Sequence, residues 1–215
     1  MKLQSRLVIL SMLTALACHF SAHADESLSQ VDSLNQQLGD LVNAGRQREA
    51  IPLAKEIIAI NSELHGVSDV SVGRSQFQLA ELYWAQGRHR EADNPYKLAL
   101  WIFEQRLPPA SPETEQVLMR LVNSYSEQNL WQQVNILLLH WFDVTKQALG
   151  PDAQQTIQAM KNLAAFYRQT HRDSEADRLE RQIREVGNSY LAKIKIGIDN
   201  SDHVSCLGQL LPKIV

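Results

Sequence analysis

The sequence is poor in the features that mark most enzymes and nucleic-acid-binding proteins. It contains only 2 cysteines among 215 residues, and no G-x-S-x-G, G-x-G-x-x-G or G-x-x-x-x-G-K-S/T motif occurs in it. Its formal net charge is −3 and its lysines and arginines form no block. Because nucleic-acid binding needs a clustered basic face to neutralise phosphates, we expect no nucleic-acid partner, and we expect no catalytic residues.

Metal-binding patterns are also missing. The five histidines that follow residue 24 form no H-E-x-x-H motif and no i, i+4 pair: His65, His89, His140, His171 and His203. The stretch Asp199–Leu210 begins like a calcium loop, but Leu210 stands at the twelfth place, where such a loop needs a glutamate. The sequence therefore predicts no metal site and no cofactor.

The N-terminus has the organisation of a secretory signal. Lys2 and Arg6 come before an apolar run, and Ala22-His23-Ala24 forms an A-x-A cleavage site. We therefore expect a signal peptide over residues 1–24, with cleavage after Ala24 and a periplasmic or secreted mature protein. No later segment reaches 18 apolar residues, so no transmembrane segment is expected after signal removal.

Cys18 keeps two alternatives open. The sequence Leu16-Ala17-Cys18 faintly resembles a bacterial lipoprotein box, in which the thiol would carry lipid and anchor the protein to a membrane. An uncleaved N-terminal anchor is the other alternative. If Cys18 leaves with the signal, Cys206 is the only thiol, and no internal disulfide can form.

A repeating pattern organises the rest of the chain. In the stretch from Phe77 to Pro108, the apolar spacing predicts two helices separated by a tight turn at Gly87. Moving by 42 positions returns similar residues, as in Tyr83, Tyr125 and Tyr167, in Ala50, Ala92, Val134 and Ala176, and in Gly45 and Gly87. A single helical hairpin cannot bury its apolar face alone, so this period predicts hairpins that stack on one another.

The pattern resembles the tetratricopeptide repeat, in the 42-residue form seen in kinesin light chains and in many bacterial proteins. The resemblance is carried by L-A-x-L-Y at Leu79–Tyr83, G-R-x-x-E-A at Gly87–Ala92, Y-K-x-A-L at Tyr96–Leu100 and the loop Leu149-Gly150-Pro151-Asp152. It implies an all-α fold, a right-handed α-solenoid of about four repeats. The expected organisation is a repeat domain over 25–186, with repeats at about 28–66, 70–108, 112–150 and 153–186, and a tail over 187–215.

The tail leaves the repeat pattern. Gly187-Asn188 is expected to end the last helix, and Lys193–Ile198 alternates like a strand. The tail either folds back over repeats three and four, with a helical extension as one form it could take, or stays mobile until a partner binds. A bend or a late start is expected in the helix that contains Pro95.

The resemblance also implies where a partner would bind. In tetratricopeptide repeats the first helix of each hairpin lines a concave groove, and the matching exposed positions here are Arg74, Gln78, Glu81, Trp84, Gln116, Arg120, Asn123, Gln158, Lys161, Asn162 and Arg168. Their amide and guanidinium groups could hydrogen-bond an extended peptide. The alternative is that these positions form solvated faces and that Trp84 packs on a neighbouring repeat.

These observations predict a non-enzymatic adaptor that binds a protein or peptide partner in the cell envelope. A self-associating scaffold is the alternative. In that case, the nearly all-apolar helix Trp131–Leu149 and the tail would bury against a second copy of the chain, giving a homodimer. A third hypothesis is a small regulatory subunit of a larger assembly.

Overall fold

The computed structural model describes residues 25–199, and over this range the chain is helical and contains no strand. The predicted signal peptide with Cys18 lies outside the described residues, as do residues 200–215 with Cys206. The prediction of an all-α helical repeat fold is confirmed.

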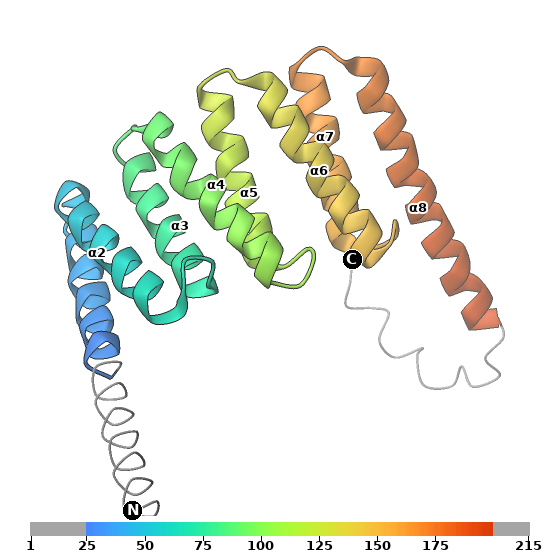
Figure 1. The fold of residues 1–215 in the computed structure, drawn as a ribbon. Coiled ribbons are helices and arrows are strands. Elements are labelled where there is room, and N and C mark those ends of the chain that lie inside the picture. The colour runs from blue at the N-terminus through green and yellow to red at the C-terminus, as the bar shows by residue number, and fades with distance from the viewer. Residues whose placement is uncertain (1–24, 200–215) are drawn as a thin grey trace, which may run out of the picture. The chain divides into compact units, whose positions relative to one another are not determined.

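The chain divides into two compact units, one ending at Trp131 and the other beginning at Gln132. The first unit opens with a helix over residues 25–43. Four further helices follow: α2 (Gln47–His65), α3 (Val70–Trp84), α4 (His89–Arg106) and α5 (Pro112–Glu127). From α2 to α5, each helix packs against the next one along the chain (Figure 1). This is the hairpin stacking that the period predicts.

The second unit contains three helices in its described part. Apart from its first residue, α6 (Trp131–Leu149) belongs to this unit, and α7 (Gln154–Gln169) and α8 (Asp173–Asp199) follow it. α7 and α8 pack together as a hairpin. The boundary between the units thus falls inside the third predicted repeat.

The turns inside the hairpins repeat at the same interval as the sequence. A left-handed residue occupies the same place in each turn, with φ of 72°, 70°, 58° and 57° at Gly45, Gly87, Asn129 and His171. The residue after each of these donates its backbone N–H to a carbonyl five positions back, at 2.8–3.0 Å: Arg46 to Leu41, Arg88 to Tyr83, Leu130 to Tyr125 and Arg172 to Tyr167. Such a bond closes the end of a helix by satisfying an orphan carbonyl. The 42-residue period is therefore present in the backbone.

The helix starts between hairpins follow the period as well. Asp69 and Ser111, which are 42 positions apart, cap α3 and α5 by accepting the N–H of Ser71 and Thr114. Asp and Ser are among the residues that favour this position, because their side-chain oxygens accept an unpaired backbone N–H. Ala153 stands at the third equivalent position and makes no side-chain cap.

The core is built from the repeated small and aromatic residues. Ala50, Ala92 and Ala176 are fully buried, which confirms that they lie at close helix contacts. Tyr83, Tyr125 and Tyr167 are buried to nearly the same extent, at 9%, 7% and 7% exposure. The guanidinium groups of Arg88 and Arg172 lie over the rings of Tyr83 and Tyr167, at 4.6 and 4.2 Å from the centroids. Tyr83 and Tyr167 thus have equivalent surroundings, whereas the ring of Tyr125 has the Lys97 ammonium 5.6 Å from its centroid.

Two local predictions near the C-terminal end are wrong. α8 does not end at Gly187-Asn188 but continues to Asp199, so residues 193–198 are helical instead of forming a strand. A strand needs a partner edge to satisfy its backbone, whereas a helix satisfies its own. α4 begins at His89, directly after the turn, so of the two effects expected of Pro95, a bend or a late start, the late start is not observed.

Within the described residues, α6 buries one stripe, Val134, Leu138, Trp141 and Thr145, while Ile136 remains 63% exposed.

Candidate partner-binding face

In the first unit, six of the predicted binding residues lie on the first helices of their hairpins, at three equivalent places. α3 carries Arg74, Gln78 and Glu81, and α5 carries Gln116, Arg120 and Asn123 at positions 42 residues later. Each of these side chains is exposed or half-buried. We call these six residues the α3–α5 face.

The central charged groups of this face bind one another. Arg120 Nη2 lies 3.1 Å from Glu81 Oε2, so an ion pair joins α5 to α3. The other oxygen of Glu81 accepts a hydrogen bond from the hydroxyl of Tyr96, a fully buried side chain of α4. Burial and this hydrogen bond raise the pKa of Tyr96 well above its ordinary value. Glu81 therefore has a structural role that links three helices.

A second ion pair crosses the same two helices. Arg74 Nη2 lies 3.4 Å from Glu113 Oε1, and both side chains are largely exposed. The amides of the face differ from its charged groups. Gln78, Gln116 and Asn123 are exposed, and none of the three has a hydrogen-bonding partner among residues 25–199. The face thus combines charges that are already paired with amides that can both donate and accept.

Trp84 lies apart from this arrangement. It is the last residue of α3 and is half-buried, with its ring edge-on to His89 at a centroid distance of 4.2 Å. Its ring therefore packs on the start of the second helix of its own hairpin, and the half-buried side chain remains a predicted binding residue.

In the second unit, the predicted binding residues all lie on α7. Gln158 donates to Asn162 Oδ1 at 3.0 Å, so these two amides partly satisfy each other. Lys161 is exposed. Arg168 binds three carboxylates of the hairpin partner α8: Asp173 at 3.1 Å, Glu180 at 3.2 Å, and Asp177.

These acidic partners raise the pKa of Arg168 above its ordinary value, first through hydrogen bonds to Glu180, Asp173 and Asp177. The guanidinium of Arg168 therefore connects α7 to the first part of α8 through ion pairs. Arg168 therefore has a structural partner set, and a ligand would have to compete with three carboxylates for it.

The sequence reasoning missed one polar cluster in the first unit. Ser124 of α5 is fully buried and donates to Asp93 Oδ1 of α4 at 2.7 Å, while Gln128 Nε2 reaches the two oxygens of Asp93 at 3.2 and 3.0 Å. The signal for it was present, because the residues 42 positions on either side of Ser124 are the buried Leu82 and Phe166. A hydroxyl at an apolar repeat position indicates a buried partner.

Two further observations limit the chemistry. Within residues 25–199, no group of three or more His, Cys, Asp or Glu side chains is placed to hold a metal ion. In the same range, no helix combines the length and the apolar character needed to cross a membrane.

The fold and the turn geometry resemble those of helical repeat proteins of the tetratricopeptide type. The sequence model described as tetratricopeptide repeat matches residues 32–105. These residues therefore carry the sequence signature of the family, and the resemblance stated from the sequence is confirmed. The family's fold is typical of interaction scaffolds that bind other proteins without catalysis.

Solved structures extend the likeness over most of the chain. The kinesin-light-chain-type protein of Podosopora anserina, with nearly identical TPR-like repeats, matches with a TM-score of 0.63 and 21% identity, over 74% of this chain and 76% of that chain. BtubC (BKLC) from P. vanneervenii matches with a TM-score of 0.56 and 17% identity, over 77% of this chain and 72% of that chain. At these identities the comparison establishes the fold alone. None of the curated proteins compared with the sequence matches it.

Proposed function

We propose that this protein is a non-enzymatic adaptor of the cell envelope that binds an extended segment of a protein partner on the α3–α5 face. Export rests on the signal-like residues 1–24. The binding mode rests on one observation: the face exposes three amides without partners, while its arginines are held in ion pairs.

This arrangement favours recognition of the main chain of a peptide. A carboxamide offers both donors and an acceptor, so it can pair with the N–H and C=O of a backbone whatever the side chains are. Recognition of a carboxylate would need a guanidinium that is free to move. On this face, a ligand carboxylate would share Arg120 with Glu81 and Arg74 with Glu113, so it would gain less than it would from two unpaired guanidinium groups.

The test compares two sets of exposed amides on the same unit. The triple variant Gln78→Ala, Gln116→Ala, Asn123→Ala removes the amides of the face. The control variant Asn94→Ala, Gln105→Ala removes exposed amides from α4. The full chain with an affinity tag is used to isolate partners from an envelope fraction, and their dissociation constants are then measured with each variant.

We expect the triple variant to weaken binding at least tenfold, because each lost hydrogen bond contributes about 1 kcal/mol. The control should bind like the natural chain. Equal affinity for the triple variant and the control would contradict the proposed face. If the triple variant and the control both lost binding, the binding surface would not be confined to the α3–α5 face.

A self-associating scaffold is the second candidate, and exposed apolar side chains favour it. Trp101 and Leu98 of α4 are 50% and 40% exposed, and Ile136 of α6 is 63% exposed. Such side chains are candidates for burial against a second copy. Light scattering at micromolar concentration distinguishes the candidates, since a constant monomer mass would remove this one.

A further inference from the structure

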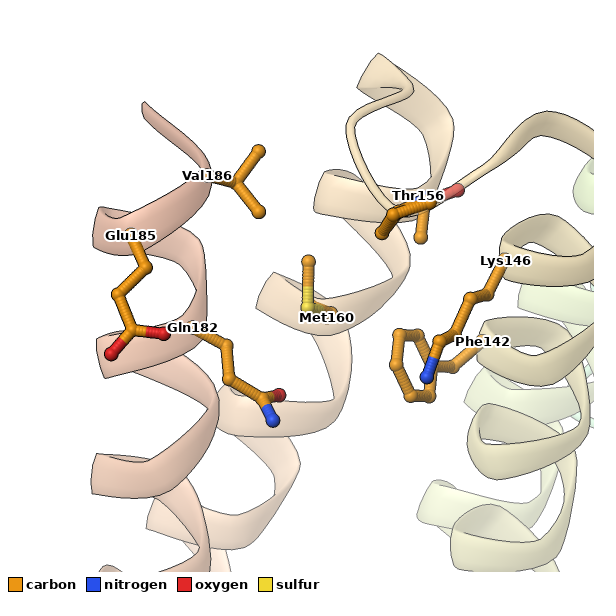
Figure 2. Close-up of a pocket in the computed structure, with 8 residues that line it drawn as sticks. Phe142, Lys146, Thr156, Met160, Gln182, Glu185 and Val186 are labelled. Atoms are coloured by element: carbon orange, nitrogen blue, oxygen red, sulfur yellow. The ribbon is translucent and has the colours of Figure 1, made fainter. Parts of the chain in front are cut away.

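The second unit contains an open pocket that the α3–α5 face does not use. Its volume is about 190 Å³, and it is lined by Phe142 and Lys146 of α6, Pro151 of the following loop, Thr156 and Met160 of α7, and Gln182, Glu185 and Val186 of α8. Figure 2 shows Met160 between the α6 side chains on one side and Gln182 and Val186 on the other. All three helices of the unit therefore contribute to it.

The chemistry of this pocket suits an aliphatic side chain. Phe142, Met160 and Val186 provide apolar walls, and the Lys146 ammonium lies 5.5 Å from the centroid of the Phe142 ring. A cavity of roughly 150 Å³ with walls of this kind can hold a benzene-sized group. The pocket therefore has room for one or two side chains of the size of leucine.

The chain carries matching side chains beyond its described part. After Asp199, the last described residue of α8, the sequence continues with an apolar stretch that contains Leu207, Leu210, Leu211, Ile214 and Val215. We propose that Leu207 and Leu210 of the same chain occupy this pocket between α6, α7 and α8. This proposal does not depend on the proposed partner-binding function.

Distance along the chain permits this contact. From Val186 to the end of α8 at Asp199, the helix rises about 20 Å. The eight residues from Asp199 to Leu207 can span about 26 Å when extended, which is enough to return to the pocket. A short tether also keeps the segment at an effective concentration of about millimolar, so modest apolar burial is sufficient for occupancy.

Charge neither favours nor opposes this fit. Glu185 and Lys146 both line the pocket, and Lys213 follows the leucines in the sequence. A segment from another protein could also fill the pocket, but it would have to compete with leucines that are covalently held nearby. The tail of this chain is therefore the occupant that the geometry favours.

Disulfide trapping tests the proposal with the full chain. With Cys18→Ser in place, Cys206 is the only native thiol, and it directly precedes Leu207. A second thiol is introduced by Gln182→Cys at the pocket or, as the matched control, by Arg184→Cys. Two residues along α8 turn the control thiol by about 200°, to the opposite side of the helix, and both native side chains are exposed.

Mild oxidation is followed on non-reducing gels and by intact mass. We expect the intramolecular disulfide to form at least about tenfold faster with Gln182→Cys than with Arg184→Cys, because tethering alone serves both positions equally. Adding Leu207→Asp and Leu210→Asp should reduce the faster rate to that of the control without changing the helical content.

Similar rates at the two positions would overturn the proposal. A fast rate that survives the two leucine substitutions would also overturn it, because the apolar side chains would then not be the reason for contact. Selective formation of disulfide-linked dimers at position 182 would overturn it in favour of a tail exchanged between two copies.

Discussion

Replacing glycine by alanine is predicted to have opposite effects at two sites of the first unit, because α3 and α4 pack closely at Gly73. A Cβ atom added to Gly73 of α3 would lie 2.6 Å from Cε1 of Phe103 and 3.1 Å from Cγ2 of Ile102, both on α4. Those two side chains are 2% and 0% exposed, so they have no free space into which to move. By contrast, a Cβ atom added to Gly39, in the helix over residues 25–43, would meet nothing within 4 Å.

At either site, replacing glycine by alanine inside a helix stabilises the folded state by about 1 kcal/mol through helix propensity. At Gly73, overpacking of a buried ring opposes this gain, and a contact this short belongs near the upper end of the range of about 1–3 kcal/mol. We therefore expect Gly73→Ala to destabilise the protein by about 1–2 kcal/mol and Gly39→Ala to stabilise it by about 1 kcal/mol.

Circular dichroism at 222 nm gives the melting temperatures. For a chain of this size, about 1 kcal/mol corresponds to about 2–4 °C. If Gly73→Ala raised the melting temperature as much as Gly39→Ala, the packing of α3 on α4 described above would be wrong. A small loss at Gly73 combined with the expected gain at Gly39 would show that Phe103 yields more easily than its burial indicates.

Three further predictions concern stability, and one concerns binding. Ala92→Arg should lower the melting temperature sharply, since overpacking of about 1–3 kcal/mol is added to the burial of a charge, and an unchanged melting curve would refute the register. Gly87→Ala should cost about 1 kcal/mol in thermal unfolding because its φ is 70°; no loss would contradict the left-handed turn. Asp69→Ala should cost about 1 kcal/mol at pH 7 through the lost cap. The backbone hydrogen bond from Ser71 lowers the pKa of Asp69, so this contribution is present above the unfolded pKa of about 4 and is lost as the pH falls through the folded pKa. The difference in melting temperature between Asp69→Ala and the natural chain should therefore disappear at acidic pH. A difference that persists at pH 2 would argue against the charged cap. Once a partner is identified, its dissociation constant should change by less than about threefold between 50 and 500 mM salt, because the arginines of the face are already paired; a steep dependence would favour recognition by charge.

The period of the sequence predicted the fold well because hairpin geometry depends on few residue types. A left-handed residue is needed once in each turn, and Gly45 and Gly87 indicate it openly. Asn129 and His171 take the same conformation without glycine, so here position in the repeat was a better guide than residue type. At the C-terminal end, the alternation over residues 193–198 is compatible with either a strand or a helix. The helix forms there without needing another segment for its hydrogen bonds.

The binding face was harder to predict, for a physical reason. The repeat register specifies which side chains of α3 and α5 point away from the core, and these positions are exposed or half-buried. It does not specify which of these side chains form ion pairs with one another. Glu81 and Arg120 are 39 residues apart, and their ion pair depends on the distance between two helices and on the rotamers of two long side chains. A sequence period contains neither quantity.

The pairing of these charges changes what the face can recognise. Had Arg74 and Arg120 been free, two guanidinium groups on neighbouring helices would have suited a partner rich in Asp or Glu. In the structure, each already has a carboxylate partner, and Glu81 is further held by the buried Tyr96. Exchanging one carboxylate for another brings little net free energy, whereas the exposed amides give up only bonds to water and gain about 1 kcal/mol for each bond to the partner. For this reason, we expect the shape and main chain of an extended segment to decide which partners bind, with the charge of its side chains less important.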